Sequence, residues 1–237
     1  MNPIAAWPPL YTVRISQRAR HARLHIAPGR GLEVVLPKGM AEERARQVLD
    51  SQRDWVKKHL RQALALAAPE SPPETIRLPA IGQTLAVRRQ ATGGDTIQLH
   101  EMDAALYVDG RTDDDRAMYA VLQRWLKRKA KAVLTTWLAR VSREIALPYR
   151  KLTVRLQRGR WGSCTAQGHI SLNAKLLLVE PILVRHVLVH ELCHTVHLNH
   201  SPAFWALVAR HDPDWVRLRK TCRERWRDMP GWVGARS

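Results

Sequence analysis

Two histidines four residues apart, with a glutamate directly after the first, lie in the stretch Val189-His190-Glu191-Leu192-Cys193-His194-Thr195-Val196-His197-Leu198-Asn199-His200-Ser201. On a helix, residues at this spacing share one face, so both imidazoles can bind the same Zn²⁺ ion. A carboxylate beside them can accept the proton of a water molecule that the metal activates. The stretch therefore predicts one catalytic zinc ion, with His190 and His194 as ligands and Glu191 as the general base.

A third protein ligand is expected, because catalytic zinc usually has three and keeps one position open. His200 lies six residues after His194, and a helix that simply continued would carry it away from the metal. We expect the helix to end just before His200, with Asn199 in the left-handed conformation that turns the chain back. His186 is equally consistent with a group behind the ligands and with a surface residue, whereas the position of His197 favours a helix-end surface residue.

A chance occurrence of the pattern is the alternative, since the chain contains 11 histidines. The pattern lies, however, in a strongly apolar helical segment, where a buried histidine or glutamate is costly without a partner. The further histidine at position 200 also has a spacing that can complete a metal site. These features favour zinc binding.

Composition narrows the class of protein without naming a function. The chain has 237 residues, enough to bury a substantial core, and a formal net charge of +18. Such a charge attracts polyanions at low salt, but a solvated basic surface in an arginine-rich protein is the favoured explanation, and a nucleic-acid-binding surface is the alternative. Three cysteines argue against a disulfide framework. Since no secretory signal and no apolar run of the ~20 residues that cross a bilayer is present, we predict a cytoplasmic protein without a membrane partner.

Hydrophobic periodicity divides the chain into three segments, 1–67, 76–111 and 112–237. The first is a β-rich region followed by a helix, the second a small β region, and the third carries the zinc pattern. The stretch 68–74, rich in proline, predicts a linker or long loop. We expect strands at 11–16, 20–26, 31–36, 83–89, 96–100, 105–108, 152–156 and 169–173, and helices at 42–67, 113–145 and 182–198.

Four motifs in the second half of the chain occur together in a fixed order. They are Arg158-Gly159-Arg160-Trp161-Gly162-Ser163-Cys164, His169-Ile170-Ser171-Leu172-Asn173, Val189-His190-Glu191-Leu192-Cys193-His194 and Asn199-His200-Ser201-Pro202-Ala203-Phe204-Trp205. In this order and at this spacing they resemble the YgjP-like metallopeptidases, relatives of the SprT-like zincins. The resemblance is strong over about 150–215 and weaker toward the N-terminus.

The resemblance implies an α+β fold. A minimal zincin-like domain, in which the active-site helix packs on a small sheet, would follow a β-rich N-terminal region, or the two would form one continuous YgjP-like domain. It implies His190, His194 and His200 as the metal ligands and Glu191 as the base. A metallopeptidase acting on a peptide or protein substrate is the function that follows.

The resemblance also suggests which residues line the cleft. The loop 158–164 and the strand 169–173 would do so, with the strand as the sheet edge to which an extended substrate adds. Arg158, Arg160 and Asn173 are the candidate substrate-binding residues. The two arginines can stabilise a developing oxyanion or bind phosphate, and salt bridging explains them equally.

Two other functions remain open at this point. Members of the family are also described as metal-dependent hydrolases of nucleoside triphosphate anhydride bonds, so a pyrophosphohydrolase of the UTP type is one alternative at the same site. A basic, nucleic-acid-associated binding protein with a vestigial metal site is the other, because the net charge of +18 permits it. Metal content, and the products formed from UTP and from unfolded protein, distinguish the three.

Overall fold

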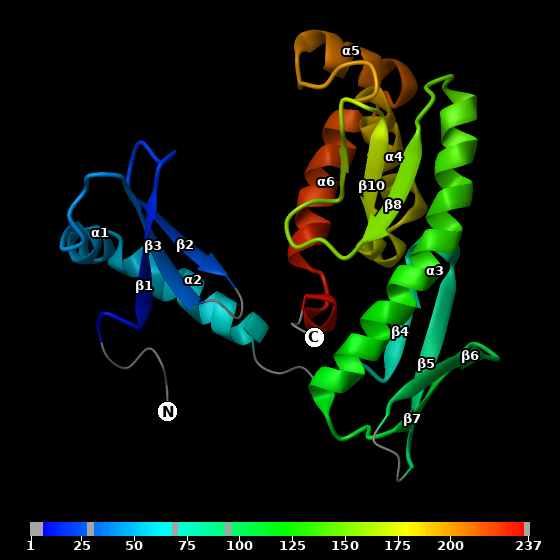
Figure 1. The fold of residues 1–237 in the computed structure, drawn as a ribbon, viewed down its shortest axis with the longest axis horizontal. Helices are drawn as coiled ribbons and strands as arrows, with labels where there is room; N and C mark the ends of the chain where they lie inside the picture. Colours follow the sequence, from blue (N-terminus) through cyan, green and yellow to red (C-terminus); the bar gives the residue numbers. More distant parts are fainter. Residues whose placement is uncertain (1–6, 28–30, 68–70, 93–95, 235–237) are drawn as a thin grey trace. The chain divides into compact units, whose positions relative to one another are not determined.

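The computed structural model describes residues 7–27, 31–67, 71–92 and 96–234, and it contains two compact units (Figure 1). The first unit spans Met1–Glu70 and the second spans Ser71–Ser237. Each has its own cluster of buried apolar side chains, as expected of separate packing units. Among the described helices, none combines the length and the apolar character that a membrane span requires.

The first unit is a three-stranded sheet that packs against two helices. Strand β3 (Gly31–Pro37) lies in the middle, parallel to β1 (Tyr11–Ser16) and antiparallel to β2 (Arg23–Ala27). The helix predicted over 42–67 is in fact two helices, because Gln52 leaves the helical conformation at φ −117° and ψ 24°. They are α1 (Arg44–Ser51) and α2 (Arg53–Ala67), and the core that the sheet shares with them consists of Leu32, Val34, Leu36, Ala45, Leu49 and Val56.

The second unit begins with a four-stranded sheet of order β4-β5-β7-β6. Strand β5 is parallel to β7, and β4 and β6 pair antiparallel on the outside. Gly110, at the end of β7, has a φ of +114°, and a side chain there would collide with the backbone of Thr96. The elements are β4 (Thr75–Leu78), the 3-10 turn η1 (Pro79–Ile81), β5 (Gln83–Ala91), β6 (Gln98–Met102) and β7 (Ala105–Gly110).

A 30-residue helix, α3 (Asp115–Glu144), runs alongside both sheets of the second unit (Figure 1). The side chain of Asp114 caps it by accepting hydrogen bonds from the backbone N–H groups of Arg116 and Ala117 at 2.9 and 3.0 Å. One face of α3 is buried at helical spacing, and the strands of 76–111 belong to the same buried cluster. The four-stranded sheet and the metal-binding part of the chain therefore share one core.

A second sheet of three strands supports the candidate site. Its order is β8-β10-β9, so β10 (His169–Asn173) is central, parallel to β8 (Lys151–Arg155) and antiparallel to β9 (Gly162–Cys164). The prediction that 169–173 is an edge strand is therefore wrong, because both sides of β10 are paired. The two edges are β8 and β9, and β9 is a three-residue strand inside a glycine-containing loop, too short to show an alternating pattern.

The remaining helices complete the second unit. The central one, α4 (Pro181–Cys193), is almost wholly buried and packs against α3, β9 and the two helices that follow. This arrangement confirms the predicted α+β fold. The other elements are η2 (Ala174–Leu178), α5 (Pro202–His211), α6 (Trp215–Arg227) and η3 (Gly231–Val233).

Candidate metal centre

Helix α4 carries the first histidine and the glutamate in its last turn. Pro181 occupies the first turn, where its missing N–H is not needed. The helix ends at Cys193, earlier than the predicted 198, and His194 is its C-cap with φ −68° and ψ −15°. Because His194 still has helical dihedrals, its side chain lies one turn from that of His190. The ring centroids of this pair are 4.9 Å apart.

The connection between α4 and α5 brings His200 back to the same place. The expectation that Asn199 turns the chain in a left-handed conformation is wrong. Instead, the Asn199 side-chain oxygen accepts a hydrogen bond from the N–H of Ser201 at 3.3 Å, and the Ser201 hydroxyl caps α5 by accepting from Phe204. The described non-glycine residues with positive φ lie elsewhere, at Asp103, Ala104 and Ala146.

Three imidazoles converge at the end of α4. One ring nitrogen from each of His190, His194 and His200 lies within 4.8 Å of the others, and the two Nε2 atoms of His190 and His200 are 3.2 Å apart. The Nδ1 atom of His194 lies 2.9 Å from the carbonyl oxygen of His197. Since a carbonyl only accepts, Nδ1 carries the proton and leaves the Nε2 lone pair of His194 free to bind a metal.

Two aromatic residues of α5 hold these rings in place. Phe204 is fully buried and stacks on His194 with ring centroids 4.4 Å apart, and it meets His190 and His200 edge-on at 5.0 and 4.9 Å. Trp205 stacks on His200 at 5.4 Å. The sequence showed the motif that contains both residues. It did not show that they pack on the imidazoles, because this packing joins residues of different elements.

Electrostatics favour neutral rings at this site. Burial, followed by the charge that the neighbouring histidines would carry, lowers the pKa of His190 to about 3. The same two causes lower the pKa of His200. Neutral imidazole is the form whose lone pair binds a metal ion.

Glu191 follows His190 in the last turn of α4, with 4% of its surface exposed. Its Oε2 atom is buried and has no hydrogen-bond partner among the described residues. Burial raises the pKa of this carboxyl to about 8, and the positive charge of Arg160 opposes the shift. A buried carboxylate oxygen without a partner is costly, and a cation in the histidine cluster would stabilise its ionised form.

Gly162 on β9 makes room for this carboxylate. A β-carbon at position 162 would lie 2.6 Å from Oε1 of Glu191 and 2.8 Å from its Cδ and Cγ atoms. Contacts this short do not occur between real atoms, so the glutamate occupies the space that a side chain at 162 would need. The edge strand and the base therefore fit only because residue 162 is glycine.

The residues present fit a single divalent cation. Three imidazoles with converging nitrogens are a donor set typical of zinc, and Glu191, the residue after His190, has a buried carboxylate oxygen with no partner among the described residues. The cluster contains the three histidines that the sequence predicted as ligands, and no fourth described His, Cys, Asp or Glu joins it. Such a set leaves one coordination position open.

The three candidate substrate-binding residues occupy different environments. Arg158 and Arg160 are exposed on the loop between β8 and β9. Of the two, only Arg160 contributes to the pKa of Glu191, which its positive charge lowers. Asn173 is fully buried, and its amide donates hydrogen bonds to the carbonyls of Gln157 and Arg160 at 2.9 and 2.8 Å. Through these contacts Asn173 holds the loop between β8 and β9 in place. A direct contact of its side chain with substrate stays a prediction.

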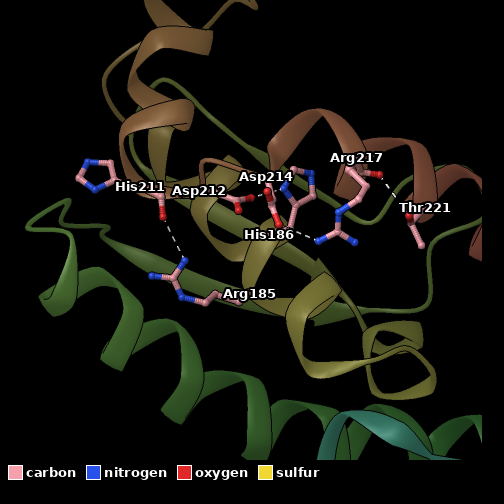
Figure 2. A network of polar contacts seen from close by, with 7 residues as sticks. All are labelled: Arg185, His186, His211, Asp212, Asp214, Arg217 and Thr221. Carbon is pink, nitrogen blue, oxygen red and sulfur yellow. Dashed lines mark hydrogen bonds and ion pairs between the residues drawn. The ribbon is translucent and has the colours of Figure 1, made fainter.

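A second polar cluster lies one turn before His190 on α4 (Figure 2). His186 is 4% exposed, and its Nδ1 atom lies 2.5 Å from Oδ2 of Asp212, which is 6% exposed. The ring centroids of His186 and His190 are 6.3 Å apart, so this pair lies behind the metal ligands. The sequence left open whether His186 lies behind the ligands or at the surface, and its burial excludes the surface position.

A comparison with protein-family models matches residues 20–225 to the YgjP-like metallopeptidase domain. The match covers most of the chain and includes the loop between β8 and β9, the histidine cluster and both aromatic residues of α5. Searches of curated proteins and of solved structures found no match. The four motifs and the histidine cluster agree with the family match, which confirms the resemblance, and the chain belongs to the YgjP-like metallopeptidase family.

Proposed function

We propose that this protein is a zinc-dependent peptidase, in which His190, His194 and His200 hold one zinc ion and Glu191 is the general base. One observation carries the proposal. Three imidazole nitrogens lie within 4.8 Å of one another, and the residue that follows His190 in α4 carries a buried carboxylate oxygen that lacks a partner among the described residues. The family match supports the reaction class, since its members are metallopeptidases.

Each residue of the site has a distinct task in this proposal. When bound, zinc supplies Lewis-acid activation of water and of a carbonyl oxygen. Glu191 accepts the proton of the attacking water at Oε2 and later returns it to the leaving amine. The positive charge of Arg160 favours the ionised form of the base, because it opposes the rise in the pKa of Glu191 that burial causes. Its exposed guanidinium is also a candidate donor to a developing oxyanion.

The free edge of β9 is the proposed binding place for the substrate backbone. One side of β9 pairs with β10 over Gly162–Cys164, and its outer side has no strand partner in the sheet. An extended peptide that adds to this edge places its carbonyls along the strand whose glycine touches Glu191. Strand addition recognises backbone and not sequence, so it leaves substrate preference to other residues.

The decisive experiment compares the wild-type protein with the Glu191→Gln and His190→Ala variants. We expect Glu191→Gln to keep stoichiometric zinc and to lose hydrolysis of an unfolded protein substrate, because only the proton acceptor is removed. His190→Ala should lose both. Each protein is also incubated with UTP, and nucleotide products are measured. Retained peptide hydrolysis by purified Glu191→Gln contradicts the assignment of the base, and turnover of UTP alone contradicts the peptidase proposal.

A further inference from the structure

A large basic cavity lies away from the histidine cluster, between the N-terminal half of α3, the end of β8 with the loop that follows it, and η3. Its volume is about 780 Å³. Gln123 of α3 donates a hydrogen bond to the carbonyl of Trp232 at 2.7 Å, which holds η3 against the helix and forms one wall. Five basic side chains line the cavity, namely Arg116, Arg124, Lys127, Arg155 and Arg158.

No described carboxylate lines the cavity or forms an ion pair with these five cations. The contrast with neighbouring positions is clear, because Lys129 on the same helix is paired with Glu101. Like charges that converge without counter-charges repel one another, and they focus a field that attracts an anionic ligand.

Three of the five cations, Arg116, Arg124 and Lys127, lie in a stripe along one face of α3. Positions 116, 120, 123, 124 and 127 follow helical spacing, so they share a face, and the stripe is about 17 Å long at 1.5 Å per residue. A stripe of this length matches roughly five residues of an extended chain. Arg155 and Arg158 face it from the second sheet and its loop. The shape therefore suits a chain that carries several charges better than a single small anion.

The cavity and the proposed active site are joined by one short loop. Arg158 lines the cavity. Arg160, two residues later, lowers the pKa of Glu191, and Gly162 packs against the Glu191 side chain. Gly162 lies four positions after Arg158, so their Cα atoms are at most about 14 Å apart, which roughly four residues of an extended peptide can span. A peptide that pairs with the edge of β9 can thus extend past the bond to be cleaved, and its further residues can reach the cavity.

We propose that this basic cavity selects acidic peptide substrates, binding a segment rich in glutamate and aspartate that lies roughly four to five residues from the bond to be cleaved. The proposal rests on the proposed peptidase function and adds the substrate class. Arginine suits this task, because its guanidinium binds carboxylates in a bidentate manner. Strand addition at β9 would supply the common backbone contacts, and the cavity would supply the preference.

The lining favours a peptide over a nucleic acid. Sites for single-stranded nucleic acid combine cations with aromatic side chains on which bases stack. The described residues that line this cavity include no aromatic side chain, and the apolar ones among them are Ala120, Leu156 and Val233. Trp232, next to the lining, is only 4% exposed and cannot present its ring to a base.

The test measures binding of fluorescein-labelled peptides to the zinc-loaded Glu191→Gln protein, which keeps the site intact without cleavage. One peptide alternates glutamate with alanine, and its partner has glutamine at each glutamate position. The cavity variant carries Arg124→Glu and Lys127→Glu. The control carries Arg128→Glu and Lys131→Glu, exposed residues of the same helix outside the cavity, so both proteins lose the same charge.

We expect the glutamate peptide to bind at least about tenfold more tightly than the glutamine peptide, and the cavity variant to lose this preference while the control keeps it. Equal loss in both variants overturns the proposal, since net charge alone would explain binding. Tighter binding of oligothymidylate or inorganic tripolyphosphate at the same residues also overturns it, in favour of a phosphate ligand. Wild-type cleavage of both peptides at equal rates refutes the inference alone, whereas selective binding without any cleavage refutes the proposed peptidase function.

Discussion

Gly162 and Glu191 are in such close contact that a β-carbon on the first would lie 2.6 Å from Oε1 of the second. The two residues belong to different elements, the edge strand β9 and the helix α4. Their contact ties the position of the proposed base to the strand that is proposed to bind substrate. It also makes residue 162 the most direct place to disturb catalysis without touching a metal ligand.

Replacement of Gly162 by alanine should therefore reduce turnover while zinc binding persists. The added methyl group must displace the Glu191 carboxylate, and a shift of about 1 Å at a catalytic group lowers the rate by roughly 100-fold. Zinc content by atomic absorption should stay stoichiometric, because the three atoms nearest to the added carbon all belong to Glu191 and none to a histidine. Gly159→Ala is the matched control on the same loop, since a β-carbon there meets no atom within 4 Å. Equal activity of the two variants would contradict the assigned role.

Replacement of His200 by alanine should weaken zinc binding by more than about 100-fold. Loss of a residue that only supports a ligand already costs 10–100-fold, and His200 is proposed to be a ligand itself. His197→Ala is the control, because the structure uses the backbone carbonyl of residue 197, which the substitution leaves in place. Competition with a chelating dye measures both affinities. A His200→Ala protein with wild-type affinity would show that the third donor is another group.

Removal of the metal should lower the stability of the protein by mass action. A ligand that binds only the folded state stabilises it by about 2.7 kcal/mol when its free concentration is 100 times its Kd. Thermal unfolding with and without added zinc, after treatment with a chelator, measures the effect. The double variant His190→Ala with His194→Ala should unfold at the same temperature in both conditions. A zinc-dependent shift in that variant would locate the binding elsewhere.

The buried pair of His186 and Asp212 should contribute more to stability than the exposed pair of Asp214 and Arg217 nearby (Figure 2). Asp212→Ala leaves the buried Nδ1 of His186 without its partner, at a cost of about 1–3 kcal/mol. Asp214→Ala removes a contact whose two side chains are 64% and 62% exposed, and such changes stay within about 0.5 kcal/mol. Urea unfolding of the zinc-free proteins compares the two. Equal free energies of unfolding would mean that the burial of His186 and Asp212 has no energetic consequence.

Much of the candidate site follows from local sequence. The spacing of His190 and His194 places them one helical turn apart because 3.6 residues make a turn, and Glu191 is necessarily adjacent. The proline and apolar residues of 181–193 specify a buried helix, and periodicity located the strand 169–173 at its observed bounds. These features depend on neighbours along the chain, so no knowledge of the fold was needed.

Other features depend on residues that are far apart in the chain. The sequence did not reveal that β9 is a strand, that β10 lies at the centre of its sheet, or that a missing side chain at 162 accommodates Glu191. Nor did it reveal that Arg158 belongs to a cavity with the cations of α3.

The sequence by itself determined the residue pattern of the candidate metal site, two histidines one helical turn apart with a glutamate between them. Only the tertiary structure decided which strand edge and which charges surround that pair. The physical reason is that helix periodicity is set by hydrogen bonds between residues four apart, whereas strand order and cavity walls are set by packing between segments whose separation in sequence carries no fixed period.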